Sequence, residues 1–123
     1  MLTVTDLQVS YGAVIAVNGV SFTATAGEIT CVMGRNGVGK TTLLSTIMGH
    51  TTLHGGRIAL RGKDISAAAT YRRVTAGLGL VPQEREIFPS LSVRENMDVA
   101  ARPGPWNFKT VLHLFPGLAG RFD

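Results

Sequence analysis

The sequence feature that most constrains this chain is a glycine-rich octapeptide at residues 34–41. It reads Gly-Arg-Asn-Gly-Val-Gly-Lys-Thr and matches the pattern G-x-x-x-x-G-K-[ST] at every fixed position. Glycine accepts positive φ angles, so the successive N–H groups of such a loop can converge on one point. This ring of donors suits phosphate oxygens, and a helix that begins after the loop directs its positive dipole end at them. We therefore predict a nucleotide phosphate site here.

Two side chains of the motif have separate roles in this prediction. Lys40 supplies a mobile positive charge that can reach the β- and γ-phosphates, and the hydroxyl of Thr41 can ligate Mg²⁺. The expected ligands are thus ATP and Mg²⁺. The candidate phosphate-binding residues are Gly34, Arg35, Asn36, Gly37, Val38, Gly39, Lys40 and Thr41.

The sequence around the loop predicts the strand, loop and helix that the motif requires. Residues 28–33 are a short and mostly apolar run that indicates a buried strand, with Cys31 as a small buried side chain. After the loop, apolar residues recur at helical spacing until Gly49, where the helix should end. Two further strands, at residues 2–9 and 17–25, come before the loop.

The remaining chain predicts a mixture of short strands and helices. Ser92-Val93-Arg94-Glu95 is a capping-box pattern that should start a helix through Ala101. Apolar residues between Phe108 and Phe115 recur at i, i+3, i+4 and i+7, which predicts an amphipathic helix ended by Pro116. Further expected elements are a strand at 57–60, a helix at 67–76 and a buried strand at 78–81.

Composition limits the class of protein. The chain has 123 residues, of which 45% are hydrophobic and 16% charged, as expected for one globular domain. The net charge of +4 is scattered, and no basic stripe alternates with aromatic residues, so nucleic acid is not an expected partner. The N-terminus lacks the pattern of a signal peptide, and no window reaches the ~18 apolar residues of a membrane span. We expect a cytoplasmic location.

One pair of histidines has the spacing of some zinc sites. His50 and His54 stand at i and i+4. They follow the glycine that should end the helix, and no third ligand is evident in the sequence. A surface turn is therefore the favoured interpretation.

With the loop, its two preceding strands and Val81-Pro82-Gln83 identified, the whole chain resembles the ATP-binding subunit of an ABC transporter. The resemblance implies an α/β fold: a P-loop NTPase nucleotide-binding core with an N-terminal antiparallel β subdomain, truncated before the helical subdomain. Residues 1–123 would form the N-terminal part of one nucleotide-binding domain.

The resemblance also assigns roles to three further residues. Tyr11 matches the aromatic residue that stacks on adenine, although a turn tyrosine half-packed on the first strand is the plain alternative. Thr42 matches a residue that meets the α-phosphate. Gln83 matches a glutamine that contacts Mg²⁺ or the attacking water, and its carboxamide offers both a donor and an acceptor.

Two segments point to a narrower group. Residues 33–42 and 85–91 resemble the urea-type importer ATPases, and slightly less the branched-chain amino-acid importers. Glu84 departs from that pattern, in which a glycine is the commoner residue. The family resemblance implies that the segment from Gln83 to Leu91 receives a membrane permease subunit on the inner face of the cell membrane. Ile87, Phe88 and Leu91 would form its apolar floor, with core packing under the loop as the equally supported alternative.

The family's other nucleotide motifs do not occur in residues 1–123. These are a Leu-Ser-Gly-Gly-Gln-like signature, an apolar strand ending in Asp-Glu, and a switch histidine. The resemblance implies a second ATP-binding subunit that closes over the nucleotide. We assign no catalytic residue in this chain, with Gln83 as an accessory, and expect weak nucleotide binding with negligible hydrolysis.

Two other function classes compete with a transporter ATPase. A small-molecule kinase or GTPase is disfavoured because no Asn-Lys-x-Asp motif occurs and two strands precede the loop. A non-catalytic module that binds nucleotide or docks on a membrane subunit stays open.

Overall fold

The computed structural model describes residues 1–35, 37 and 39–121. The chain divides into two compact units, Met1–Leu80 and Val81–Asp123. The first unit contains β1 (Leu2–Tyr11), β2 (Val14–Ala24), α1 (Lys40–Met48), β3 (Gly55–Leu60), β4 (Lys63–Asp64) and α2 (Thr70–Thr75). The second contains α3 (Val93–Ala100), α4 (Phe108–Leu114) and the 3-10 turn η1 (Pro116–Leu118).

The first unit is built on an antiparallel sheet. Its strand order is β2-β1-β3-β4, so the first strand of the chain lies in the interior of the sheet and pairs on both sides. In this register Val4 lies opposite Phe22 on β2 and opposite Ile58 on β3. The sheet confirms the expected strands at both N-terminal positions and at residues 57–60.

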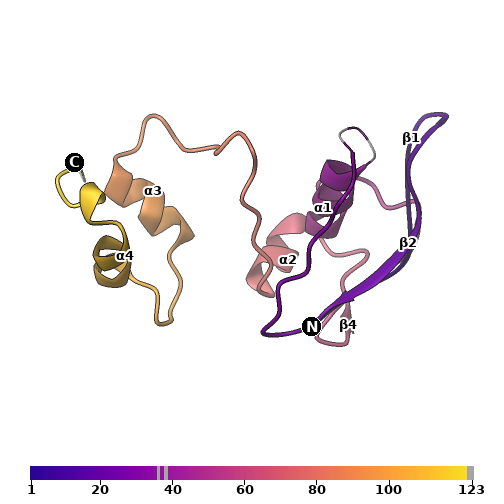
Figure 1. The fold of residues 1–123 in the computed structure, drawn as a ribbon, viewed down its shortest axis with the longest axis horizontal. Helices are drawn as coiled ribbons and strands as arrows, with labels where there is room; N and C mark the ends of the chain where they lie inside the picture. The colour runs from indigo at the N-terminus through magenta and orange to yellow at the C-terminus, as the bar shows by residue number, and fades with distance from the viewer. Residues whose placement is uncertain (36, 38, 122–123) are drawn as a thin grey trace. The chain divides into compact units, whose positions relative to one another are not determined.

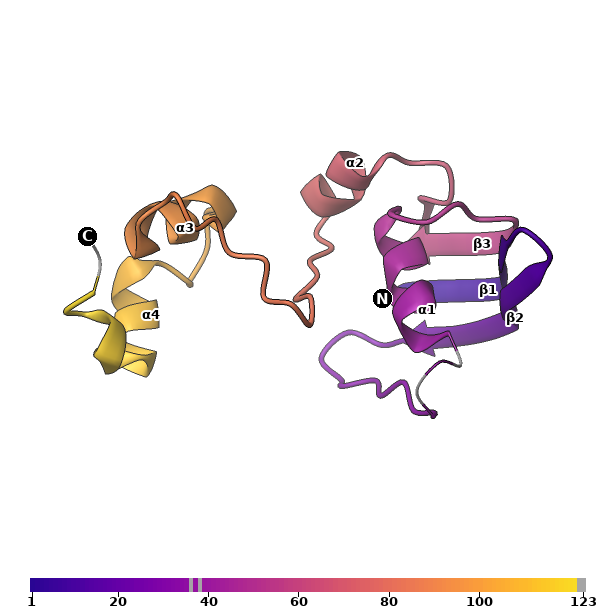
Figure 2. The same cartoon turned by 90° about the horizontal axis from the view of Figure 1, so that it is seen from above.

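Helix α1 covers one face of this sheet (Figures 1 and 2). Apolar side chains of the helix and of three strands are buried together, and Ile65 from the loop after β4 joins them. Because burial of an aliphatic side chain contributes about 1.5–3 kcal/mol, this layer is the main source of stability in the unit. The cluster consists of Val4, Leu7, Val9, Val17, Leu43, Ile47, Ile58 and Ile65.

A buried arginine fastens the end of α1 to α2. Arg73 is only 3% exposed. Its Nη1 donates to the carbonyls of Thr46 and Ile47, both at 2.9 Å, and its Nε and Nη2 donate to the carbonyls of Ala68 and Ser66, also at 2.9 Å. The acceptors on α1 belong to the last turn of the helix, where carbonyls lack helical partners and the dipole favours a cation. Burial lowers the pKa of Arg73.

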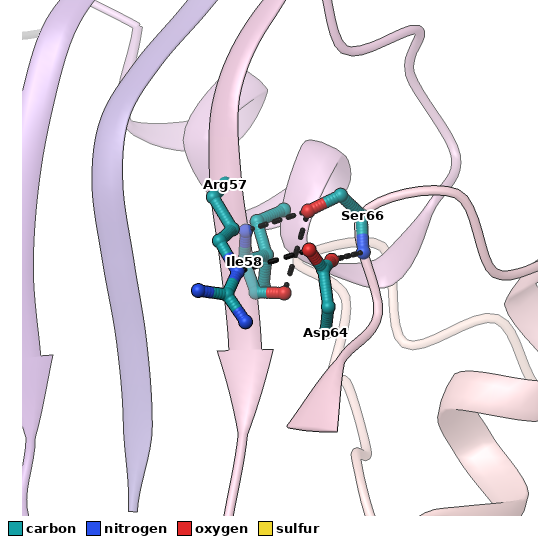
Figure 3. A network of polar contacts seen from close by, with 4 residues as sticks. All are labelled: Arg57, Ile58, Asp64 and Ser66. Atoms are coloured by element: carbon teal, nitrogen blue, oxygen red, sulfur yellow. Dashed lines mark hydrogen bonds and ion pairs between the residues drawn. The ribbon is translucent and has the colours of Figure 1, made fainter. Parts of the chain in front are cut away.

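A small polar network fixes the edge of the sheet (Figure 3). Asp64 accepts hydrogen bonds from Arg57 Nε at 2.9 Å and from the Ser66 backbone N–H at 2.8 Å. The Ser66 hydroxyl in turn accepts from the N–H of Ile58 at 2.8 Å. Hydrogen bonds from the Ser66 side chain and backbone, with a smaller contribution from Arg57, lower the pKa of the Asp64 carboxyl.

Two predicted strands are absent from the described part of the chain. Residues 28–33 have no regular secondary structure and are exposed, with Ile29 at 94%, and Cys31 is exposed as well. Residues 78–81 likewise form no strand. A strand needs a partner for its N–H and C=O groups, and the only described sheet is the antiparallel one, which these segments do not join. An apolar run alone therefore does not make a strand. The predictions of buried strands at residues 28–33 and 78–81, and of a buried Cys31, are wrong.

The second unit confirms both predicted helices. α3 begins with the reciprocal capping box, in which Glu95 N–H donates to Ser92 Oγ at 3.2 Å and Ser92 N–H donates to Glu95 Oε2 at 2.8 Å. α4 begins with a second box made by Asn107 and Thr110. None of the described helices combines the length and apolar character that crossing a membrane requires.

The role of Arg73 can be tested by replacing it with methionine. The carbonyls that it serves would stay buried without donors, so we expect Arg73→Met to lower the free energy of unfolding by about 2–4 kcal/mol. Urea unfolding followed by circular dichroism measures this. Arg72→Met, at an exposed position of the same helix, is the matched control and should change stability by less than about 0.5 kcal/mol. Equal effects of the two changes would contradict the assigned role.

The Asp64 network predicts a pH dependence. Because the folded-state pKa lies below the ordinary value of about 3.9, ionised Asp64 stabilises the fold above that pH, and the contribution is lost as the pH falls through the folded-state pKa. We expect Asp64→Asn to be less stable than the unaltered chain at pH 7 and to approach it near pH 3, by urea midpoints at each pH. Glu28→Gln, at an exposed position outside the sheet, controls for loss of a carboxylate. A constant Asp64→Asn difference across this range would argue against the network.

Candidate phosphate-binding site

The glycine-rich loop leads directly into α1. The helix begins at Lys40, and Gly39 is its N-cap residue. Gly34 and Arg35 precede it in irregular backbone, and Gly37 lies in a turn with φ +83°. Two predicted site residues, Asn36 and Val38, lie outside the described residues.

Gly39 meets a steric limit that only glycine satisfies. Its φ is +97°, in the left-handed region, and a Cβ atom at this position would lie 2.4 Å from the backbone oxygen of Ala16 on β2. The start of α1 thus lies directly against β2. The glycine that the motif requires for phosphate is also required for packing of the helix on the sheet.

The first turn of α1 has the features of an anion site. Gly39 has no side chain to cap the helix, and no acidic residue lies in the first turn. The N–H groups of that turn therefore have no side-chain acceptor from the N-cap residue, and the helix dipole is not offset by a carboxylate. Thr41 is exposed at this end of the helix, and Thr42 is half-buried.

Lys40 reaches across the loop. Its Nζ donates to the backbone carbonyl of Gly34, at the other end of the octapeptide. An ammonium group held over the loop lies where it can exchange a neutral carbonyl for a phosphate oxygen, which is the stronger acceptor. Of the predicted set, the structure thus brings Lys40 into contact with Gly34, and Gly39 directly precedes Lys40 as the N-cap residue.

Tyr11 is the last residue of β1. Hydrogen bonds with the side chains of Thr51 and Thr42 lower the pKa of the Tyr11 phenol, since they favour the phenolate. The side chain is 54% exposed, so much of the ring is open to a ligand. The structure thus leaves the side chain of Tyr11 exposed at the end of β1.

Gln83 belongs to the second unit. It is an exposed residue of the turn closed by the bond from Arg85 N–H to the Pro82 carbonyl, at 3.2 Å. Arg85 and Glu86 have φ values of +66° and +42°, so the left-handed conformation falls after Glu84, the position where a glycine is commoner. The joint metal site of Thr41 and Gln83 stays a prediction.

Neither His50 nor His54 belongs to a metal cluster in the described part of the chain. Within it, no group of three or more His, Cys, Asp or Glu side chains is arranged to hold a metal ion. His54 has a different role, because its Nδ1 accepts a hydrogen bond from the N–H of Ser10 at 3.2 Å.

The segment after Gln83 is held by a residue that sequence reasoning missed. Asn96 on α3 accepts from the Phe88 N–H at 2.8 Å, and its Nδ2 donates to the carbonyls of Phe88, Leu91 and Ser92 at 3.0–3.1 Å. Phe88 and Ile87 are exposed while Leu91 is half-buried. The only signal in the sequence was an asparagine one position after a capping-box glutamate, which does not specify such contacts.

Comparison with known proteins places the chain in a family. The family model described as "ABC transporter" matches residues 17–119. The chain is 36% identical over 94 residues to the arabinose import ATP-binding protein AraG of Yersinia pestis, an alignment that covers 76% of this chain and 18% of that protein. It is 38% identical over 97 residues to the lipopolysaccharide export system ATP-binding protein LptB of Haemophilus influenzae, covering 79% and 40%.

A solved structure shares the fold. It is the dimeric post-hydrolysis state of the ATP-binding cassette MJ0796 bound to ADP and Pi, with a TM-score of 0.74 and 19% identity. The match covers 89% of this chain and 52% of that one, so this chain corresponds to about half of that cassette. The nucleotide-binding cassette fold with its N-terminal antiparallel sheet is therefore confirmed. Together with the match over residues 17–119, the loop and its helix show that this chain belongs to the ABC transporter ATP-binding family.

Proposed function

We propose that residues 1–123 form the N-terminal part of the ATP-binding subunit of an ABC transporter and bind the phosphates of ATP at the glycine-rich loop. The observation that carries the proposal is the start of α1. This end of the helix combines a left-handed Gly39, a first turn without a side-chain cap, and the Lys40 ammonium. This combination provides backbone donors, a dipole and a charge for one anion.

We propose that the residues of this site hold a nucleotide together with Mg²⁺. The loop N–H groups and Lys40 would hold the phosphates, Thr42 would meet the α-phosphate, and the open face of Tyr11 would stack on adenine. Hydroxyl and carboxamide oxygens are ligands that Mg²⁺ accepts, so Thr41 and Gln83 would hold the ion. Bound Mg²⁺ would neutralise charge on the phosphates.

For the transported solute we propose urea or branched-chain amino acids. The support is the resemblance of residues 33–42 and 85–91 to those importers, from which Glu84 departs. The names of the two relatives specify arabinose import and lipopolysaccharide export. Because the solute contacts other subunits of such a transporter, no side chain of this chain is assigned to it.

The proposed partners are a permease and a second ATP-binding subunit. The permease would bind at residues 83–91, where Ile87 and Phe88 are exposed, and would hold the chain on the inner face of the cell membrane. The second subunit is proposed because the similar solved cassette is a dimer. A non-catalytic module that uses the same two surfaces is the second candidate, since residues 1–123 contain no signature or Asp-Glu motif.

The proposal predicts a specific effect of Lys40→Ala. Loss of one charge-assisted contact should weaken ATP binding by roughly tenfold or more, measured by isothermal titration calorimetry. Lys63→Ala, at an exposed position on β4, is the matched control and should leave the dissociation constant within about twofold. Unchanged ATP binding by Lys40→Ala would refute the assigned site.

Hydrolysis by the 123-residue chain should be negligible, and robust turnover that depends on Lys40 would refute that expectation.

The permease surface predicts a second effect. Phe88 is 53% exposed, and an aspartate there would place a charge in an apolar interface, so we expect Phe88→Asp to reduce capture of the chain by the permease subunit several-fold. Trp106→Asp changes another exposed aromatic residue of the same unit, outside residues 83–91, and should leave capture unchanged. Equal capture of Phe88→Asp and the unaltered chain would remove Phe88 from the interface.

A further inference from the structure

Residues 88–91, just before α3, form a closed turn. The N–H of Leu91 donates to the carbonyl of Phe88 at 3.1 Å, and Pro89 is the second residue of the turn. A proline at this position restricts the turn, because its ring fixes φ. The next residue, Ser92, is the N-cap of α3. The turn therefore leads directly into the helix.

The side chain of Asn96 pairs with the backbone of Phe88 on both sides of its Cα atom. Its Oδ1 accepts from the Phe88 N–H at 2.8 Å, and its Nδ2 donates to the Phe88 carbonyl at 3.1 Å. A planar carboxamide holds its donor and acceptor at a fixed separation, so it can serve both groups of one residue as a neighbouring strand would. These two bonds restrict rotation of the Phe88 backbone.

Asn96 itself is fixed by the start of α3. Its backbone N–H donates to the Ser92 carbonyl at 2.9 Å, and its Nδ2 also lies 3.1 Å from the Leu91 carbonyl and 3.0 Å from the Ser92 carbonyl. The side chain is half-buried. One carboxamide on a capped helix thus fastens the whole turn to that helix.

Apolar packing does little to order this turn. None of the residues that the structure describes between positions 81 and 121 is fully buried. Ile87 is 70% exposed and Phe88 is 53% exposed, so neither side chain is enclosed in a core. Because a contact that orders a segment must offset its conformational entropy, the hydrogen bonds of Asn96 are the main contribution described here.

We propose that Asn96 is a positioning residue for the permease surface, where it holds the turn that carries Phe88 in one conformation. This inference rests on the proposed function, because it assumes that a permease subunit binds at residues 83–91. A segment that is already ordered loses less conformational freedom on binding. Asn96 therefore raises affinity for the permease through Phe88.

The test measures the apparent affinity of the 123-residue chain for the permease subunit of its own transporter, purified in detergent. We expect Asn96→Leu, which removes the hydrogen bonds at similar side-chain size, to weaken this affinity about fivefold. In a Phe88→Ala background the same change should alter it by less than about twofold, since both residues act through one contact. Asn107→Leu is the matched control, because Asn107 Oδ1 accepts from the Thr110 N–H in the same unit. It should stay within about twofold.

Folding of the second unit is checked independently. Trp106 is the one tryptophan of the sequence and belongs to this unit, so its emission reports whether the unit stays folded. Asn96→Asp is the second variant. It keeps an acceptor for the Phe88 N–H and suits the first turn of a helix, but it loses the Nδ2 donor. It should weaken the affinity at least about twofold, and it decides the matter if Asn96→Leu does not fold.

The outcomes separate the inference from the proposed function. Weaker permease binding that disappears in the Phe88→Ala background supports the inference. If the Asn96 variants bind as the unaltered chain does while Phe88→Asp does not, the inference is overturned and the permease surface stands. Additive effects would also overturn it, because Asn96 would then act independently of Phe88. If the unaltered chain is not captured, or Phe88→Asp is captured normally, the proposed surface fails and the inference with it.

Discussion

The close approach of α1 to β2 at Gly39 is the contact on which the first unit depends. The helix begins against the backbone of Ala16, and a side chain at this point would overlap the carbonyl oxygen there. This contact sets where the first turn lies, and the buried layer of Leu43 and Ile47 then follows along the sheet. One steric constraint therefore places both the apolar core and the end of the helix that faces the glycine-rich loop.

The other end of α1 is accommodated by polar groups. Arg73 satisfies carbonyls from the last turn of the helix and from the loop before α2, with no carboxylate partner among the residues that the structure describes. Gly49 makes room for it, because a Cβ there would lie 3.1 Å from Arg73 Nε. In the second unit the Asn96 side chain likewise hydrogen bonds with backbone groups of residues 88–92. Side-chain contacts to backbone thus hold segments that lack a strand partner.

Local patterns predicted local structure well. The capping box at Ser92 and Glu95 formed as expected, since both partners lie within one turn of the chain. The glycine at position 49 ended its helix, and the apolar patterns at residues 2–9 and 17–25 predicted two strands, whereas the antiparallel sheet was implied by the family resemblance. By contrast, residues 28–33 have a strand-like composition but form no strand, because a strand also needs a partner strand, which is distant in the sequence. The burial of Arg73 could not be predicted from the adjacent pair Arg72-Arg73, of which only Arg73 is buried.

The candidate phosphate loop was predictable from the sequence alone, because its glycines, lysine and threonine occur at fixed spacing within eight residues. The starts of α1, α3 and α4 also followed from neighbours in the chain, whereas α2 begins at Thr70 and not at residue 67 as expected. The hydrogen bond that the Ser10 N–H donates to His54 Nδ1, by contrast, is visible only in the folded chain. These residues are far apart in sequence, and the order and lengths of the paired strands bring them together. Local conformation follows from near neighbours, whereas a shared site follows from which strands pair and where each ends.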